Sequence, residues 1–179
     1  MWHSTYLLRL YSGLLLYLGP ATATLYQNES RYSVAHVPFL TGEDVVWVVA
    51  PHADDEILGA GGLLLQAKRA GAQIHILYVT VSGFKTVRGG ADTDSKTRRQ
   101  EVRSVTNSLE VAAYDILYQG EEQHLKLDTL PLADLVEWLE RTSACALAQV
   151  RPTVALLPSP KHNHQDHRAV YRAGLAALR

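Results

Sequence analysis

A run of six apolar residues that leads directly into a dense polar cluster constrains the fold of this chain most strongly. The run, Val45–Ala50, is too short for a secure helix and rich in β-branched residues, which is typical of an interior strand of a parallel sheet. Pro51 lacks a backbone donor and predicts the end of that strand. Because ligands of open α/β sheets bind beyond the carboxyl ends of strands, the segment His52–Glu56 is expected at a reactive edge.

The rest of the chain alternates between strand-like and helix-like segments, which predicts an α/β fold with a mostly parallel sheet. Gly71 follows one of the helical segments and marks its end. The connection from the first strand to the next is expected to be right-handed. The predicted strands are Val45–Ala50, Gln73–Val81, Tyr114–Tyr118 and Thr153–Leu157, and the predicted helices are Leu58–Ala70, Ser95–Leu109, Leu132–Gln149 and Arg168–Arg179.

Composition narrows the class of protein without naming a partner. The chain has 179 residues, enough for a single core, and its formal net charge of -1 gives no basic surface that would indicate nucleic-acid binding. Cys145 is the single cysteine, which excludes an intrachain disulfide and a multi-cysteine zinc site. It lies in an apolar helical pattern and is expected to be a packed, unreactive thiol.

The N-terminal part allows two interpretations. The leucine-rich segment from Tyr6 to Leu18 is too short to span a membrane as an independent helix, so no stable membrane span is expected. It fits an amphipathic helix that packs on the domain and, less well, a secretory signal ending near residue 23. We therefore expect an apolar segment and connector over residues 1–43, a functional domain over residues 44–179, and a cytoplasmic protein, or an exported one if residues 1–23 are a signal.

A second polar cluster, Lys161–His167, follows the last predicted strand. The two clusters are far apart in sequence, but each follows a strand of the same predicted sheet, so they are expected to meet at one edge. His52, Asp55 and His167 would then form a set of two imidazoles and one carboxylate. Such a set suits Zn²⁺ with one position left for water, which is the arrangement of a catalytic zinc site.

Further residues of the two clusters have the chemistry to assist hydrolysis of an amide. Asp54 is adjacent to the expected ligands but not needed as one, so it is placed to accept a proton from water. His164 is expected to stabilise an oxyanion or protonate the leaving amine, with His162 as the alternative. Asp166 is expected to orient a histidine.

These segments resemble the PIG-L/LmbE-like zinc-dependent N-deacetylases. The resemblance rests on Pro51–Glu56, Leu58–Gly62, Arg98–Glu101 and His164–His167, and it extends from about Asp44 to Arg179. Ala53 replaces the usual second proline of the first signature, and the chain ends twelve residues beyond His167, so the domain is expected to be C-terminally short.

The resemblance implies a Rossmann-like three-layer fold and roles for individual residues. It implies zinc binding by His52, Asp55 and His167, a general base at Asp54, and assistance from His164. It also implies that Arg98 and Arg99 lie near the substrate.

The function that follows is removal of an acetyl group from an N-acetylated amino sugar or glycoconjugate by a zinc-dependent hydrolase. The alternative is a non-catalytic module of the same fold that binds metal or sugar. Asp54 favours the enzyme, because a module that only binds has no use for a base beside the ligands.

Overall fold

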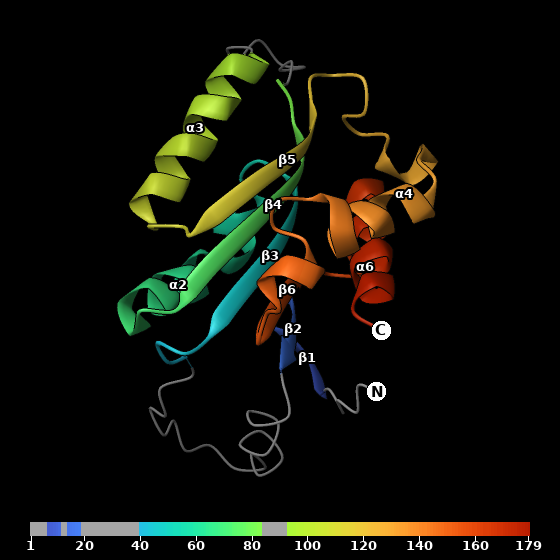
Figure 1. Cartoon of the computed structure of the whole chain (residues 1–179). Coiled ribbons are helices and arrows are strands. Elements are labelled where there is room, and N and C mark those ends of the chain that lie inside the picture. The colour runs from blue at the N-terminus through green and yellow to red at the C-terminus, as the bar shows by residue number, and fades with distance from the viewer. Residues whose placement is uncertain (1–6, 12–13, 19–39, 84–92) are drawn as a thin grey trace.

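The computed structural model describes residues 7–11, 14–18, 40–83 and 93–179. Its strands form one six-stranded sheet in the order β1-β2-β6-β3-β4-β5 (Figure 1). The four strands β6, β3, β4 and β5 are mutually parallel, as the sequence predicted, whereas β1 and β2 pair antiparallel at the edge beside β6. The strands are β1 Leu7–Tyr11, β2 Leu14–Leu18, β3 Val45–His52, β4 Gln73–Val81, β5 Ala113–Gln119 and β6 Val154–Pro158.

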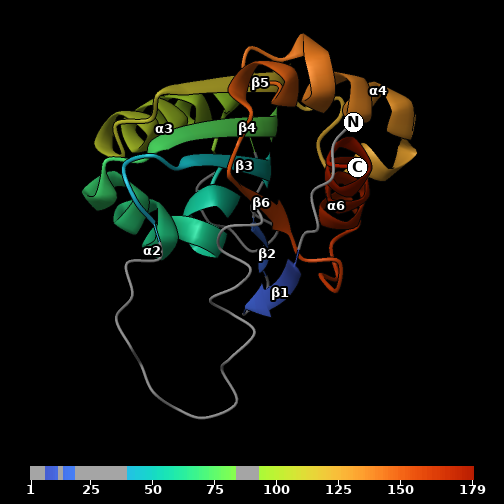
Figure 2. The same ribbon diagram turned by 60° about the horizontal axis from the view of Figure 1, so that its bottom comes forward.

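Helices cover both faces of the sheet, which confirms the predicted three-layer α/β fold. Figures 1 and 2 show α2 and α3 on one face and α4 and α6 on the other. The helices are α2 Asp55–Ala70, α3 Ser95–Ser108, α4 Leu132–Glu137, α5 Leu147–Val150 and α6 Gln165–Ala177, with a 3₁₀ turn η1 at Leu127–Thr129 and a π-helical turn η2 at Trp138–Thr142.

Alternation of side chains along β3 gives each face its own core. Val46 and Val48 pack on the α2 face, and Trp47 and Val49 pack on the α6 face, all at most 2% exposed. The run Val45–Ala50 of β3 is therefore packed on both sides, which is why it contains no polar residue.

Several predicted boundaries are confirmed, and Cys145 is buried as expected. β4 spans the predicted residues, and Gly71 ends α2 with a positive φ of 78°. Burial raises the pKa of the Cys145 thiol to about 11, which agrees with the expected unreactive thiol.

The predicted end of β3 at Pro51 is wrong, because the strand continues to His52. Pairing of β3 with β6 ends at Val48, so no strand on that side requires the N–H that proline lacks. On the other side, His52 pairs with Thr80 of β4, and Thr80 Oγ1 donates a hydrogen bond to the Pro51 carbonyl.

The single predicted helix over Leu132–Gln149 is also wrong. The segment forms α4, η2 and α5, with a non-helical stretch beginning at Ser143. The Ala144 N–H donates to Asp115 Oδ2 (2.9 Å), and the indole of Trp47 donates to the Cys145 carbonyl (2.8 Å). These tertiary hydrogen bonds hold the backbone out of a continuous helix.

The N-terminal apolar segment forms strands where an amphipathic helix was expected. β2 pairs with β6 from Leu14↔Pro158 to Leu18↔Val154, and β1 pairs with β2. An exposed edge of β6 would leave backbone groups unpaired, and the hairpin satisfies them. No helix within the described residues is long and apolar enough to cross a membrane.

Candidate metal centre

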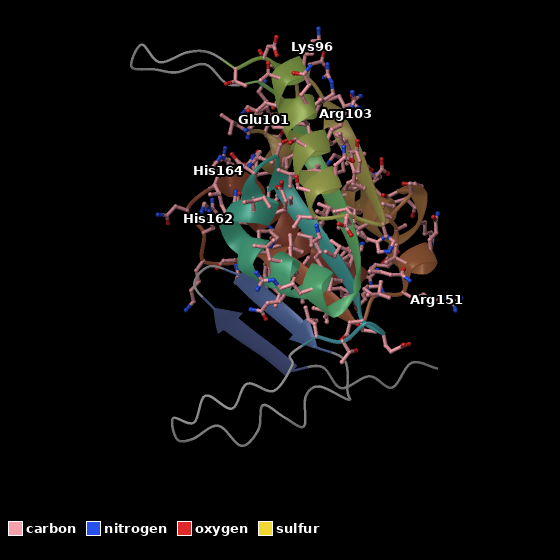
Figure 3. The ribbon with its side chains drawn as sticks, turned by 90° about the vertical axis from the view of Figure 1, so that its left-hand side faces the viewer. Lys96, Glu101, Arg103, Arg151, His162 and His164 are labelled. Atoms are coloured by element: carbon pink, nitrogen blue, oxygen red, sulfur yellow. The ribbon has the colours of Figure 1, made fainter. Side chains whose placement is uncertain are left out.

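Both polar clusters lie where the strand order reverses. From β3 the chain proceeds outward to β4 and β5, and it then returns to β6 on the other side of β3. The carboxyl ends of β3 and β6 flank this switch point, where open α/β sheets bind ligands. In Figure 3, His162 and His164 lie together at this edge, whereas Arg151, which precedes β6, lies at the opposite end.

Asp55 brings His52 and His167 together. The carboxylate Oδ2 of Asp55 is 3.2 Å from Nδ1 of His52 and 3.3 Å from Nε2 of His167. The same oxygen accepts a hydrogen bond from the His52 backbone N–H (2.9 Å). Asp55 lies in the first turn of α2, where the helix dipole favours a carboxylate, and α2 therefore begins three residues earlier than predicted.

These three predicted ligands fit a divalent cation. Each of His52, Asp55 and His167 offers a ligand atom, and these atoms lie within 4.8 Å of one another. Two imidazole nitrogens and one carboxylate oxygen are the donor types that Zn²⁺ prefers. The residues present are therefore suited to hold such an ion.

Asp166 orients His52 from the other side. Its Oδ2 is 3.0 Å from Nε2 of His52, and its Oδ1 accepts a hydrogen bond from the Leu127 N–H (3.0 Å). Among the described residues, His52, His164 and Asp166 form a second set with the spacing of metal ligands. However, His52 uses Nδ1 toward Asp55 and Nε2 toward Asp166, so Asp166 fits the role of a carboxylate that fixes the ring of a ligand histidine.

The two imidazoles that face Asp55 have opposite charge preferences. Burial disfavours the charged form of His52, but hydrogen bonds to Asp166 and Asp55 outweigh it and raise its pKa to about 9. Burial lowers the pKa of His167 to about 4, although Asp55 opposes the shift. At neutral pH and without metal, His52 is protonated and His167 is neutral.

Asp54 lies beside the centre in an unusual backbone conformation. Its φ of 120° falls in the left-handed region, which costs a non-glycine residue about 1–3 kcal/mol. Two contacts hold it there. Glu56 accepts a hydrogen bond from the Asp54 N–H (2.9 Å), and Arg98 donates to Asp54 Oδ2 (2.8 Å).

Arg98 and Arg99, both predicted near the substrate, differ in position. The guanidinium of Arg98 donates to Asp54, to the Ala53 carbonyl and to Glu101, so Arg98 links α3 to the polar cluster. Arg99 forms no hydrogen bond or ion pair within the part of the chain that the structure describes. The structure thus brings Arg98, and not Arg99, into contact with predicted site residues.

His164 caps α6 and its ring faces His52. Nδ1 of His164 accepts a hydrogen bond from the Asp166 N–H (3.2 Å), and its ring centroid lies 5.0 Å from that of His52. His162, the alternative, lies farther out. Its ring stacks on His167 with centroids 4.0 Å apart, and its Nδ1 accepts from the His164 N–H.

Three residues near the centre were not predicted from the sequence to have a role. They are Glu56, which is 2% exposed and fixes Asp54, Leu127, which binds Asp166, and His124, whose ring is 5.4 Å from that of His52. Glu56 lies inside the first cluster, and its position was a usable signal. His124 lies in the connection from β5 to η1, and Leu127 begins η1, in a stretch whose sequence contains no pattern.

The structure of this chain is similar to several solved structures. Over 74% of its length, the chain is 29% identical to the conserved protein TT1542 of Thermus thermophilus, with a TM-score of 0.54. It aligns with N,N'-diacetylchitobiose deacetylase of Pyrococcus horikoshii over 75% of its length at 18% identity (TM-score 0.50), and with the 4-carboxy-2-hydroxymuconate hydratase of Pseudomonas putida over 75% at 21% identity (TM-score 0.50).

The chain spans about half the length of these structures, covering 54%, 49% and 55% of them respectively. They include a deacetylase and a hydratase, so the fold alone does not decide the reaction. A search of curated protein sequences finds no match. The family model of GlcNAc-PI de-N-acetylase, PIG-L, matches residues 47–178, which include both polar clusters, and the chain therefore belongs to the PIG-L family.

Proposed function

We propose that this protein is a metal-dependent N-deacetylase that hydrolyses the acetamide of an N-acetylated amino sugar or glycoconjugate. The observation that carries the proposal is the position of Asp54 beside a compact set of potential ligands, His52, Asp55 and His167. A deacetylase needs a proton acceptor next to such ligands, whereas a binding module does not. Membership of the PIG-L family supports the same substrate class.

His52, Asp55 and His167 would hold the ion, for which Zn²⁺ is the best chemical match. A bound divalent ion supplies Lewis acidity for an amide carbonyl and lowers the pKa of water. The two histidines differ in protonation state before the metal binds. His167 is already neutral at pH 7, whereas His52 must release its proton before its Nδ1 can act as a ligand.

Asp54 is the general base in this proposal. Its Oδ2 is bonded to Arg98, and its Oδ1 has no partner within the described residues, so Oδ1 is available to accept a proton from the attacking water. Arg98 and Glu56 fix the carboxylate and backbone of Asp54 before substrate binds. This preorganisation is the role that we assign to the left-handed conformation of Asp54.

His164 is the proposed electrophilic partner. Because its Nδ1 accepts from the Asp166 N–H, the neutral ring carries its proton on Nε2. Burial, followed by the charge of His52, lowers the pKa of His164 and keeps it neutral at pH 7. Nε2–H is then a donor for the oxyanion that develops on the carbonyl or, in a later step, for the leaving amine.

The test combines metal analysis with amine release from a panel of N-acetylglucosaminides. We expect about one divalent ion per chain, amine release that stops with a chelator and returns with Zn²⁺, and loss of both metal and activity in His52→Ala/His167→Ala. Metal binding without amine release from any member of the panel would favour the binding module. Undiminished metal in the double variant would show that the ligands are assigned wrongly.

A further inference from the structure

His124 lies against the candidate metal centre but has no part in the function proposed above. It belongs to the connection between β5 and η1, and its ring stands nearly perpendicular to that of His52, at 79° with centroids 5.4 Å apart. Both ring nitrogens of His52 already face carboxylates, those of Asp55 and Asp166. His124 is therefore not a hydrogen-bond partner of His52, and it is in neither of the sets with ligand spacing among the described residues.

The polar atoms of His124 have no partner within the described part of the chain. Its Nδ1 is shielded from solvent and forms no hydrogen bond, and its Nε2 forms none either but is not shielded. Most buried polar groups are paired, because leaving one unpaired costs about 1–3 kcal/mol. A histidine with a purely structural role at this position would be expected to have a protein partner.

An unpaired nitrogen is not sufficient evidence of function, as His75 shows. Nδ1 of His75 is also buried and unpaired, but His75 pairs with Trp47 near the beginning of β3, far along the strands from the His52–Thr80 pair. His124 differs in its surroundings. The groups that act on it electrostatically are His52, Asp166, His164 and Arg98, which are all residues of the candidate centre.

We infer that His124 is a substrate-contact residue whose Nε2 forms a hydrogen bond with a ring hydroxyl of the amino sugar. This inference rests on the proposed function for the identity of the ligand. A neutral imidazole nitrogen donates or accepts a hydrogen bond, and so does a hydroxyl, so the two groups are complementary. A position on the β5–η1 connection, with its ring 5.4 Å from that of His52, suits a group that selects the sugar without taking part in the chemistry.

The test measures binding, so that it does not depend on turnover. Metal-loaded wild type, His124→Phe and His124→Gln are titrated calorimetrically with methyl N-acetylglucosaminide and with analogues that each lack one ring hydroxyl. Phe keeps the ring packing on His52 and removes the nitrogens, whereas Gln restores a polar group near the position of Nε2. His75→Phe is the matched control, because it removes another imidazole whose Nδ1 is shielded and unpaired, far from the site.

We expect His124→Phe to bind the parent sugar about fivefold to a hundredfold more weakly than wild type, the range for one hydrogen bond with a partner left unpaired. Removal of one particular hydroxyl should weaken wild type and leave His124→Phe unaffected. His124→Gln should recover part of the affinity, and both variants should retain metal. His75→Phe should bind the sugar as wild type does.

Several outcomes would overturn the inference. They are equal binding by wild type and His124→Phe, equal sensitivity of both to every hydroxyl deletion, loss of metal from His124→Phe, and no sugar binding by wild type. The outcome for the proposed function is separate. If wild type binds the sugar through His124 but releases no amine, the deacetylase proposal fails and the His124 contact stands.

Discussion

His52 and His167 face the same carboxylate oxygen, Oδ2 of Asp55, yet their pKa values move in opposite directions. His52 ends β3 just before α2, and His167 lies in α6 after β6; we call these two parts the β3–α2 arm and the β6–α6 arm. The two histidine side chains are similarly buried, at 13% and 11% exposure. One difference is Asp166, which contacts His52 and is not among the groups that shift the pKa of His167. Hydrogen bonds to Asp166 and Asp55 overcome burial and raise the pKa of His52 to about 9, whereas burial, together with three neighbouring imidazoles, lowers the pKa of His167 to about 4.

This comparison shows that burial does not by itself determine which imidazole is ready to bind a cation. Hydrogen bonds to two carboxylates outweigh burial at His52, whereas burial and three neighbouring imidazoles outweigh the single carboxylate at His167. The β6–α6 arm presents a neutral imidazole at pH 7, and the β3–α2 arm presents a protonated one. Metal binding at neutral pH should therefore release about one proton, which comes from His52.

The largest effect is expected from Asp55→Asn, which removes the charge that both arms share. An amide is a poorer metal ligand than a carboxylate. The substitution also removes one of the two carboxylates that stabilise protonated His52. We expect the affinity for Zn²⁺ to fall by at least about a hundredfold, the upper end of the range for residues that only support ligands. Competition with a chromophoric chelator measures this affinity. Asp134→Asn, on α4, is the control, and an affinity of Asp55→Asn close to wild type would refute the shared role.

The second prediction concerns the pH dependence of stability in the metal-free protein. The folded pKa of His52 lies above its unfolded value of 6.5, so its stabilising contribution is complete below pH 6.5 and is lost between pH 6.5 and about 9. The folded pKa of His167 lies below 6.5, so stability also falls from pH 6.5 toward about 4. The free energy of unfolding should therefore be highest near pH 6.5.

The shift of His52 corresponds to at most about 3 kcal/mol, or roughly 6–12 °C in Tm for a chain of this size. Calorimetry in the presence of a chelator at pH 6.5 and pH 9.5 measures it. His52→Asn should lose most of the alkaline decrease and keep the acid one. A wild-type Tm that rises between pH 6.5 and pH 9.5 would show that His52 is not the protonated arm.

Asp166→Asn should bring the pKa of His52 closer to that of His167. Removal of this carboxylate lowers the pKa of His52 and loosens its ring, so the alkaline decrease in stability should shrink. The affinity for Zn²⁺ should fall about tenfold to a hundredfold, as for other residues that orient a ligand histidine. Asp115→Asn is a matched control, because Asp115 also bonds a backbone N–H, that of Ala144, away from the centre. The role of Asp166 is rejected if both variants bind Zn²⁺ equally well.

The smallest effect is expected at His162, which supports the other arm by stacking on His167. His162→Ala removes an aromatic pair and should weaken Zn²⁺ binding about twofold to tenfold, whereas His162→Phe keeps the stack and should change little. Parallel chelator titrations compare the two variants. Equal losses in both would mean that the nitrogen of His162, and not its ring surface, is what matters.

The sequence was sufficient for the parallel core and for the meeting of the two clusters, because both depend on local pattern and on a general rule of sheet topology. It was not sufficient where tertiary hydrogen bonds overrode local preference. The break after η2 depends on Asp115 and Trp47, which are distant in sequence. The strand conformation of the N-terminal segment depends on pairing with the edge of β6.

In the candidate site, too, local pattern predicts some features and tertiary contacts determine the others. His52, Asp55 and His167 could be chosen from residue type and spacing, but the charge difference between the two imidazoles depends on burial and on tertiary contacts such as that of Asp166 with His52, 114 positions away. The contact of Arg98 with Asp54 spans 44 positions of sequence, and no local pattern separates Arg98 from Arg99. His124 lies in a loop and becomes visible only through its proximity to His52.

The central claim is that His52, Asp55 and His167 hold the metal while Asp54 moves the proton. The most direct measurement is metal content and amine release on the same preparation of Asp54→Asn. The amide keeps the size of the side chain and an oxygen for Arg98, but it cannot accept the proton. We predict full metal content and turnover reduced by about 10²–10⁴. Loss of the metal, or full metal with wild-type turnover, would contradict the account.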